Sequence, residues 1–303
     1  MKNTMKILSL AVLIVVSLGI ILYPLIANYL SEKNRSLIET QYIEAVEQMD
    51  TAALDNARAV AVAYNETLLS VPDKPYTKDA LIKASESYDT LLNVRGDGIM
   101  GYVEIPAISV NLPIYHGTEE STLDRGVGHL LGSSLPVGGL GTHCVLTGHS
   151  GLAGQKMFSD LNLLKEGDIF LLRILCQTLA YKVCEINTVL PEDTSKLTVE
   201  AGCDLCTLVT CTPYGVNSHR LLIRGERTEY EEAISVVEDA EFTPVEESTW
   251  GSEYRHGLAY GGLTIAEIGT GFGCYKAIRR ARKLKYRPRL LRQERKRGKH
   301  EAH

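Results

Sequence analysis

Aromatic residues are scarce in this chain of 303 residues, which contains four Phe and one Trp and has an aromatic content of 7%. Proteins that bind single-stranded nucleic acid stack bases on aromatic side chains, so we expect no nucleic-acid partner. The sequence also lacks internal repeats, and its basic C-terminal tail is the only low-complexity segment. A hydrophobic content of 45% is enough for one sizeable core, so we expect one soluble domain with appendages.

The seven cysteines are odd in number and irregularly spaced, which disfavours a framework of disulfides. Cys203 and Cys206 form a C-x-x-C motif, but a zinc site needs a second pair of ligands, and neither Cys274 nor the histidines supply a matching spacing. We therefore expect no metal. Three other cysteines lie in apolar, strand-like runs and are predicted to be small buried hydrophobic residues: Cys144, Cys176 and Cys184.

Residues 7–30, ILSLAVLIVVSLGIILYPLIANYL, contain no charged side chain. As a helix they would extend about 36 Å, and the hydrocarbon core of a bilayer is about 30 Å thick. We interpret residues 1–31 as an N-terminal transmembrane anchor. The alternative is a signal peptide cleaved after Ala27, but the apolar run is long for a signal peptide and Leu25 is bulky for a cleavage site.

The C-terminal tail, residues 276–303, carries 13 Lys or Arg and two Glu, a net charge of +11 that leaves −16 on the rest of the chain. Such a tail can be a solvated extension, a nucleic-acid arm or a cytoplasmic flank of a membrane span, and the N-terminal anchor favours the last. The preceding apolar stretch contains Glu267. We therefore interpret residues 231–275 as a linker with a weak second transmembrane candidate.

Residues 32–98 are predicted to be helical. Ile38, Tyr42, Ala45, Met49 and Ala53 recur at spacings of three and four, which favours one amphipathic helix after the anchor. The two prolines of SVPDKPYTKD then interrupt this pattern, and ALIKASESYDTLLN predicts a second short helix.

From residue 99 the pattern changes to short apolar or alternating runs separated by Gly, Pro, Asn and Asp. These runs are IMGYVEI, SVNLPIY, THCVLTG, DIFLLRIL, TLAYKVCEINTVL, TLVTC and RLLIRG. We predict an all-β domain that closes into a barrel over residues 99–230.

The stretch TLVTCTPYGVNSHRLLIRGER, residues 207–227, contains a cysteine that is either a buried core thiol or a nucleophile. If TLVTC and HRLLIRG are antiparallel strands joined by a loop, Cys211 and Arg220 meet at one end of the pair. A thiolate is a nucleophile, and a neighbouring arginine can stabilise it or hold a developing oxyanion. The spacing alone leaves both alternatives open.

Histidine is the natural acid or base to accompany a thiol. His149 follows a strand-like run in a glycine turn, where its side chain can face a cleft, whereas His219 should point away from Cys211 because side chains alternate along a strand. Three further histidines are predicted to be structural: His116, His129 and His143.

These residues resemble the signature of the class C, pilus-assembling sortases. The similarity extends over residues 88–230 through GDGIMGYVEIPAISVNLPIYHGT, GVGHLLGSSLPVGGLGTHCVLTGHSG and MFSDLNLLKEGDIF. It implies an eight-stranded sortase-type β-barrel in which Cys211 is the nucleophile, His149 the acid or base, and Arg220 the third catalytic residue. It implies no cofactor.

The resemblance also implies a reaction. Sortases cleave a sorting signal such as LPxTG after its threonine, hold the acyl group as a thioester, and pass it to an amine, which in class C is a pilin lysine. The expected partners are pilins or surface proteins of a Gram-positive cell, and the catalytic domain would be extracellular. The alternatives are a wall-anchoring sortase, a membrane-anchored cysteine peptidase that uses water, and a non-enzymatic binding module.

Class C sortases usually carry a lid with an Asp-Pro pair and an aromatic residue, whereas PDKPYT here has a lysine between Asp73 and Pro75, followed by Tyr76. We interpret this segment as an altered lid over Cys211, and the alternative is an ordinary linker between helices. The family also often has arginine after the active-site histidine, where this chain has Ser150.

A lid held by one ring and one exposed ion pair would be worth about 1 to 3 kcal/mol, so it should open often. Replacing both Asp73 and Tyr76 with Ala is therefore expected to speed the modification of Cys211 by a thiol reagent, followed by mass spectrometry. An unchanged rate would show that this loop does not cover the thiol.

Overall fold

The structure is a computed structural model. It describes residues 2–69, 87–150, 155–240, 248–249, 251–260 and 269–280. The chain divides into two compact units, residues 1–250 and 251–303. Within its described residues, the second unit contains helical segments at 251–260 and 269–280.

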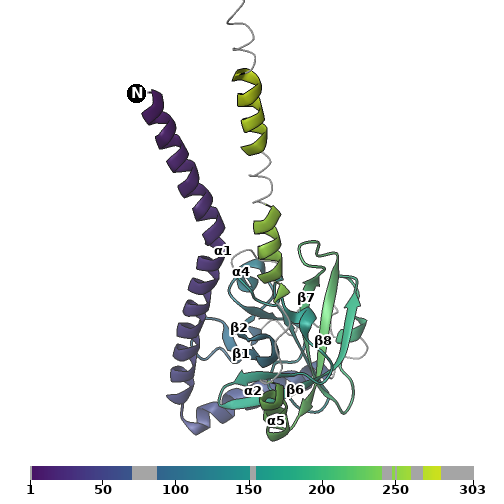
Figure 1. The fold of residues 1–303 in the computed structure, drawn as a ribbon. Coiled ribbons are helices and arrows are strands. Elements are labelled where there is room, and N and C mark those ends of the chain that lie inside the picture. The colour runs from purple at the N-terminus through teal and green to yellow at the C-terminus, as the bar shows by residue number, and fades with distance from the viewer. Residues whose placement is uncertain are drawn as a thin grey trace, which may run out of the picture. The chain divides into compact units, whose positions relative to one another are not determined.

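Eight strands form a closed barrel in the first unit, in the order β1-β2-β3-β4-β7-β8-β6-β5 (Figure 1). This confirms the predicted closed, eight-stranded, all-β fold. The strands are β1 (Ile99–Ile105), β2 (Val110–His116), β3 (Val127–His129), β4 (Thr142–Thr147), β5 (Ile169–Ile174), β6 (Gln177–Val189), β7 (Asp204–Thr212) and β8 (His219–Thr228). The pairs β2–β3 and β4–β7 are parallel and the others antiparallel.

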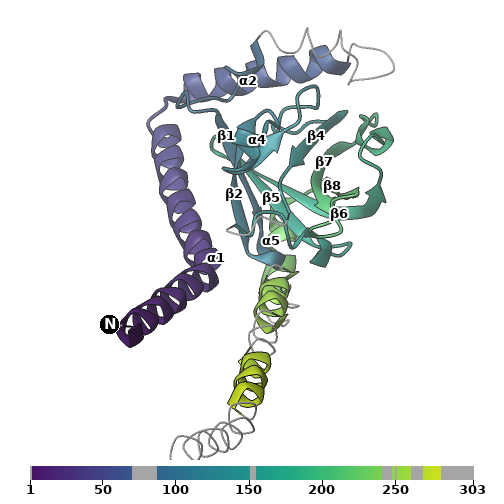
Figure 2. The same ribbon diagram turned by 90° about the horizontal axis from the view of Figure 1, so that it is seen from above.

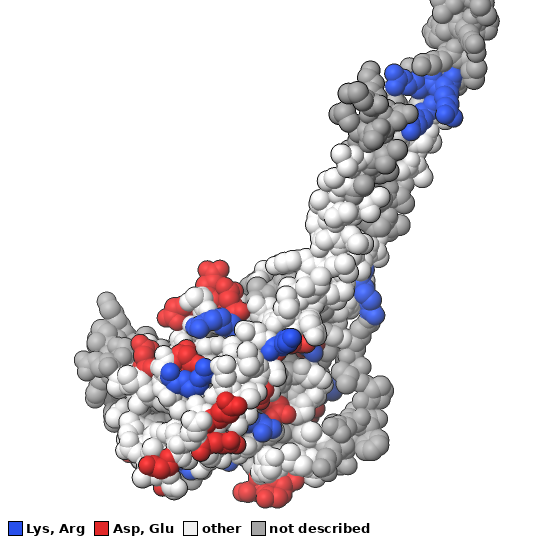
Figure 3. Space-filling model, turned by 90° about the vertical axis from the view of Figure 1, so that its left-hand side faces the viewer, with Lys and Arg blue, Asp and Glu red and all other residues white. Residues whose placement is uncertain are grey.

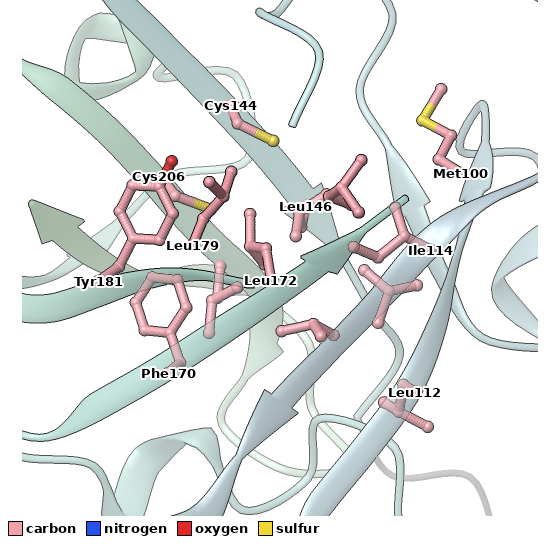
Figure 4. Close-up of a cluster of buried hydrophobic side chains, with 14 of the residues drawn as sticks. Met100, Leu112, Ile114, Cys144, Leu146, Phe170, Leu172, Leu179, Tyr181 and Cys206 are labelled. Carbon is pink, nitrogen blue, oxygen red and sulfur yellow. The ribbon is translucent and has the colours of Figure 1, made fainter. Parts of the chain in front are cut away.

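Strand alternation divides the apolar side chains between the interior of the barrel and its outer surface. In β7, Cys206 and Leu208 belong to the main core, whereas Val209 belongs to a separate cluster. The rings of Phe170 and Tyr181 stack in the main core with centroids 5.5 Å apart. Figure 4 shows the interior side chains from several strands converging.

In the described residues, two long helices precede the barrel, α1 (Lys2–Glu47) and α2 (Thr51–Leu69). The prediction of a single helix running past Ala53 is therefore wrong, because α1 ends at Glu47 and a separate helix begins at Thr51. Asp50 Oδ1 accepts a hydrogen bond from the backbone N–H of Ala53 at 2.7 Å, which caps the start of α2. The apolar spacing of three and four continues across residues 48–50, where the chain turns between the two helices. The spacing alone therefore does not show where one helix ends and the next begins.

α1 lies beside β1 and β2, and α2 crosses above the barrel in the view of Figure 2. Tyr42 fixes α1 to the barrel: its hydroxyl donates to Met100 O and accepts from Leu175 N–H, both at 3.0 Å. On α2, Ala61 and Tyr64 join the main core. Both helices are thus packed parts of the first unit.

The N-terminal part of α1 fits a membrane anchor. Among the described residues, Ile14–Glu47 is the one helical stretch long and apolar enough to cross a bilayer, judged by length and composition. Side chains such as Val15 and Ile20 are exposed. Pro24 lies inside this helix and has no N–H to donate, and α1 bends part-way along its length (Figure 2).

The remaining helices are short or lie on the outside of the barrel. α5 (Tyr230–Ala240) packs Ala233, Val236 and Val237 against β5 and β6, so the first part of the segment interpreted as a linker is an ordered helix. The described residues of this unit also form one short α-helix and three single 3-10 turns: α4 (Glu120–Leu123), η1 (Pro106–Ile108), η2 (Leu161–Leu163) and η3 (Ser195–Leu197). On the barrel face in Figure 3, acidic side chains gather with basic ones among them, consistent with the net negative charge outside the tail.

Two of the three cysteines predicted to be buried are exposed. Cys144 is buried in the main core, where it lies opposite Cys206 in the parallel pair β4–β7 (Figure 4). Cys176 lies in the turn between β5 and β6. Cys184 falls at a register shift between β6 and β8, where a bulge turns its side chain outward.

The three histidines predicted to be structural are confirmed as such by their hydrogen bonds. The ring of His116 bonds to Gly98 O and Leu91 O, and His129 Nδ1 lies 2.8 Å from the Tyr88 hydroxyl. The His143 ring lies between Thr198 O at 2.8 Å and Thr207 Oγ1 at 2.7 Å. Each ring joins segments that are distant in the sequence.

Buried His143 should make the fold sensitive to acid. Burial lowers its pKa to about 4, against about 6.5 for an ordinary histidine. Between these values the unfolded chain binds a proton that the folded chain does not, so stability present above pH 6.5 is lost as the pH falls towards 4. We expect this histidine to lower the free energy of unfolding by about 2 kcal/mol between pH 7 and pH 5.

Urea unfolding of the full chain in mild detergent, followed by circular dichroism at pH 7 and pH 5, measures this decrease in the free energy of unfolding. In His143→Gln the decrease between the two pH values should be smaller by about 2 kcal/mol, because the glutamine amide does not titrate. An identical loss in the variant would contradict this origin.

Candidate active site

The parallel pairing of β4 with β7 brings two candidate catalytic residues to one edge of the barrel. The last registered pair is Thr147 with Val209, and His149 and Cys211 each lie two residues further along their own chain segments. Parallel strands run in the same direction, so Cys211 near the carboxyl end of β7 and His149 just after the carboxyl end of β4 lie at the same edge. The two residues come together although they lie on strands that are far apart in the sequence.

The antiparallel pairing of β7 with β8 adds the arginine. Cys211 and Arg220 are direct partners in the register, as the spacing of TLVTC and HRLLIRG predicts. Side chains of such a pair have Cβ atoms about 4.5 to 5.5 Å apart on the same face of the sheet. Both residues are partly buried.

The candidate site lies on the outer face of the barrel. The residues next to Cys211 and Arg220 in their strands show this: Thr210 and Leu221 are buried, and Leu221 belongs to the interior core. The outer face carries its own apolar cluster next to the site, made of Val145, Leu197, Val209 and Leu222 with Leu130 and Val189 packed against it. Cys211 and Arg220 therefore lie next to a buried apolar cluster.

Hydrogen bonds join the segment before His149 to the end of β7. Gly148 N–H donates to Val209 O at 3.0 Å, and Thr210 Oγ1 donates to Gly148 O at 2.8 Å. Ser150 Oγ donates to Cys211 O at 2.6 Å. The residues on both sides of His149 are thus bound to the strand that carries the cysteine, Gly148 through its backbone and Ser150 through its side chain.

Asp124 is a neighbour of His149 that sequence reasoning missed. Its Oδ1 lies 3.9 Å from His149 Nε2, and the side chain of His149 is 27% exposed. Asp124 is the C-cap residue that directly follows α4. Its place in the sequence, in STLDRG, carries no signal, because only the fold brings it to the histidine.

Arg220 and His219 point to different environments. Arg220 Nη1 donates to Asn217 O at 3.2 Å and to His219 O at 3.1 Å, which holds the guanidinium at the start of β8. The His219 ring instead bonds to Ser218 Oγ at 2.9 Å. Adjacent residues of a strand face opposite sides, so the register places His219 away from the Cys211 side.

The proposed lid residues Asp73, Pro75 and Tyr76 lie outside the described residues. Ser150, noted only as a departure from the usual arginine, holds the Cys211 carbonyl through its hydroxyl. In the part of the chain that the structure describes, no group of three or more His, Cys, Asp or Glu side chains is placed to hold a metal ion.

Comparison with known proteins places this arrangement in a family. A family model described as a sortase domain matches residues 103–228. The crystal structure of sortase C from Streptococcus pneumoniae is 44% identical, with a TM-score of 0.57, and the match covers 64% of this chain and 97% of that one. The chain belongs to the sortase family.

A second solved relative of this sortase is sortase C-1 from Actinomyces oris, which is 49% identical with a TM-score of 0.53 over 59% of this chain and 99% of that one. Among curated relatives, sortase D of Bacillus subtilis is 32% identical over 130 residues, 42% of this chain. The chain spans 63% of the length of that relative and 52% of the length of sortase A from Streptococcus agalactiae.

The matched range contains His149, Cys211 and Arg220. It ends at Thr228, the last residue of β8, and begins within β1. The solved relatives are class C sortases, as the sequence resemblance indicates. The apolar N-terminal helix fits the membrane anchor of a sortase.

Proposed function

We propose that this sortase is a cysteine transpeptidase that joins pilin subunits into pili. The observation that carries the proposal is the direct pairing of Cys211 with Arg220 at the edge where His149 emerges. The solved relatives support the choice of substrate. The pneumococcal structure is described as giving insight into pilin substrate specificity, and a relative from Group B Streptococcus, at 39% identity, is described as a pilus-related sortase C.

In the first half of the reaction, the Cys211 thiolate attacks the threonine carbonyl of an LPxTG-like sorting signal. Arg220 donates hydrogen bonds to the oxyanion that develops on that carbonyl. The carbon–nitrogen bond to glycine then breaks, His149 gives a proton to the departing amine, and a thioester joins the substrate to Cys211.

In the second half, a lysine amine of another pilin attacks the thioester carbonyl. His149 accepts the proton that this amine loses, the carbon–sulfur bond breaks, and the Cys211 thiolate is regenerated. The covalent intermediate divides one amide exchange into two steps, so neither step needs a metal or an organic cofactor.

The position of the site suits a protein substrate. Cys211 and Arg220 lie on the outer face and are only partly buried, so an extended chain can reach them. With α1 as a transmembrane anchor, the barrel would be extracellular on a Gram-positive cell, where both pilin substrates are found. A wall-anchoring sortase or a peptidase with the same three residues would use a peptidoglycan amine or water as acceptor.

Cys211→Ala is expected to abolish cleavage of an LPxTG peptide, by about 10³-fold or more, because no other group can form the thioester. Mass spectrometry of the wild type with peptide should show the acyl-enzyme, and the variant should not form it. With a lysine-containing pilin peptide present, the joined product supports the pilin acceptor, whereas hydrolysis alone supports a peptidase. A thioester in the variant would contradict the assignment of the nucleophile.

His149→Ala should lose about 100-fold or more in transpeptidation, because proton transfer to the leaving amine is lost. His219→Ala is the matched control and should keep wild-type activity, because its side chain faces away from Cys211. Steady-state rates of peptide joining measure both. Equal losses would show that the two histidines had been assigned wrongly.

A further inference from the structure

Helix α1 contacts residues 155–157, a short stretch of the barrel domain that lies a few residues after His149 in the sequence. Asn28 Oδ1 accepts a hydrogen bond from the backbone N–H of Lys156 at 3.1 Å. Ser31 Oγ donates to Gln155 Oε1, also at 3.1 Å. Both helix residues lie at the carboxyl end of the apolar stretch that fits the membrane anchor, so the contact forms where that stretch meets the barrel.

Arg35 strengthens this contact one turn further along α1. Its Nη1 donates to Gln155 Oε1 at 3.2 Å and to Met157 Sδ at 3.5 Å. The residue is 7% exposed. A buried cation that is bound through directed hydrogen bonds holds its partners in one geometry.

Gln155 connects α1 to the residue beside the catalytic histidine. Its Oε1 is bound by α1, and its Nε2 donates to the backbone carbonyl of Asp124 at 3.1 Å. The carboxylate of Asp124 is the group 3.9 Å from His149 Nε2. A second connection passes through the backbone, where Phe158 N–H donates to His149 O at 3.0 Å.

A path of contacts therefore runs from Arg35 through the Gln155 side chain and the backbone of Asp124 to the Asp124 carboxylate and His149. These residues come from three segments of the chain, which are α1, the end of α4 and the stretch that follows β4. A displacement of about 1 Å in a catalytic group can cost about 100-fold in rate, so a device that fixes the histidine has a direct effect on turnover.

We propose that Arg35 and Gln155 are positioning residues, through which the membrane-proximal helix α1 holds Asp124 and His149 in their working geometry. This inference rests on the proposed function, because it assigns His149 to proton transfer. It makes α1 a part of the active-site architecture as well as an anchor.

The test uses the full chain in lipid nanodiscs, with an LPxTG peptide and an amine acceptor. Gln155→Glu keeps an oxygen that can accept from α1 but removes the N–H donor to Asp124, and Gln155→Ala removes both. We expect both variants to lower kcat about five- to tenfold and to change KM less than about twofold, because a positioning contact acts on the reacting geometry.

Arg35→Ala should lower kcat to a similar extent, and Arg35→Lys, which keeps a cationic donor, should recover part of it. The double variant Arg35→Ala, Gln155→Ala should lose no more than Gln155→Ala alone, because both residues act through one contact. The matched control is Asn111→Ala, which removes a different contact of α1: Asn111 Nδ2 lies 3.0 Å from both carboxylate oxygens of Glu39.

The control variant Asn111→Ala should keep the wild-type kcat. The proposal is overturned if Asn111→Ala and Arg35→Ala lower kcat equally at the same thermal unfolding midpoint, since α1 would then act only through general stability. It is also overturned if both Gln155 variants keep wild-type kcat.

A readout that needs no turnover separates this inference from the proposed function. The NMR resonances of the His149 imidazole, assigned with His149→Ala, should shift in Gln155→Glu and Arg35→Ala and stay in place in Asn111→Ala. A wild type that joins no peptide would overturn the transpeptidase, and the imidazole resonances would still decide whether α1 positions the histidine. Unshifted resonances in both variants would overturn the inference.

Discussion

The parallel pairing of β4 with β7 is the constraint on which the candidate site depends. It brings the residues that follow Thr147 and Val209 to one edge of the barrel, and neither His149 nor Cys211 has local sequence features that could bring it to the other. The interior supports this pair, because Cys144 and Cys206, direct partners in it, are both buried in the main core. A register slip of one residue would turn Cys211 into the core and remove it from Arg220.

Because Cys211 and Arg220 lie on the outer face of the barrel, the candidate site adds no buried charge to the core. Buried charges are costly, and an arginine next to a thiolate inside the barrel would have to offset that cost with few partners. On the outer face, Arg220 keeps contact with solvent and with the carbonyls of Asn217 and His219. The barrel thus provides rigid strand ends for the site without placing ionisable catalytic groups in its core.

Sequence patterns were sufficient for the strands that carry strong signals and for the pairing of Cys211 with Arg220, because a strand, a loop and a strand form a local unit. They missed β3, whose three residues are too few to show alternation. They also placed Cys184 in the interior, since a bulge shifts the register without any mark in the apolar pattern. Asp124 and Gln155 could not be found, because each acquires its role from a residue on another segment.

The same reasoning applies to α1, whose apolar stretch suggests only a tether. A tether would need no specific contact with the domain that it holds, yet Tyr42 joins α1 to both Met100 and Leu175. Together with the Arg35 contact, this fixes the helix at two points about two helical turns apart, which restricts rotation of the barrel about α1. Since these contacts lie in the part of α1 that follows Pro24, the edge of the barrel that bears His149 and Cys211 keeps a defined orientation with respect to that part of the helix.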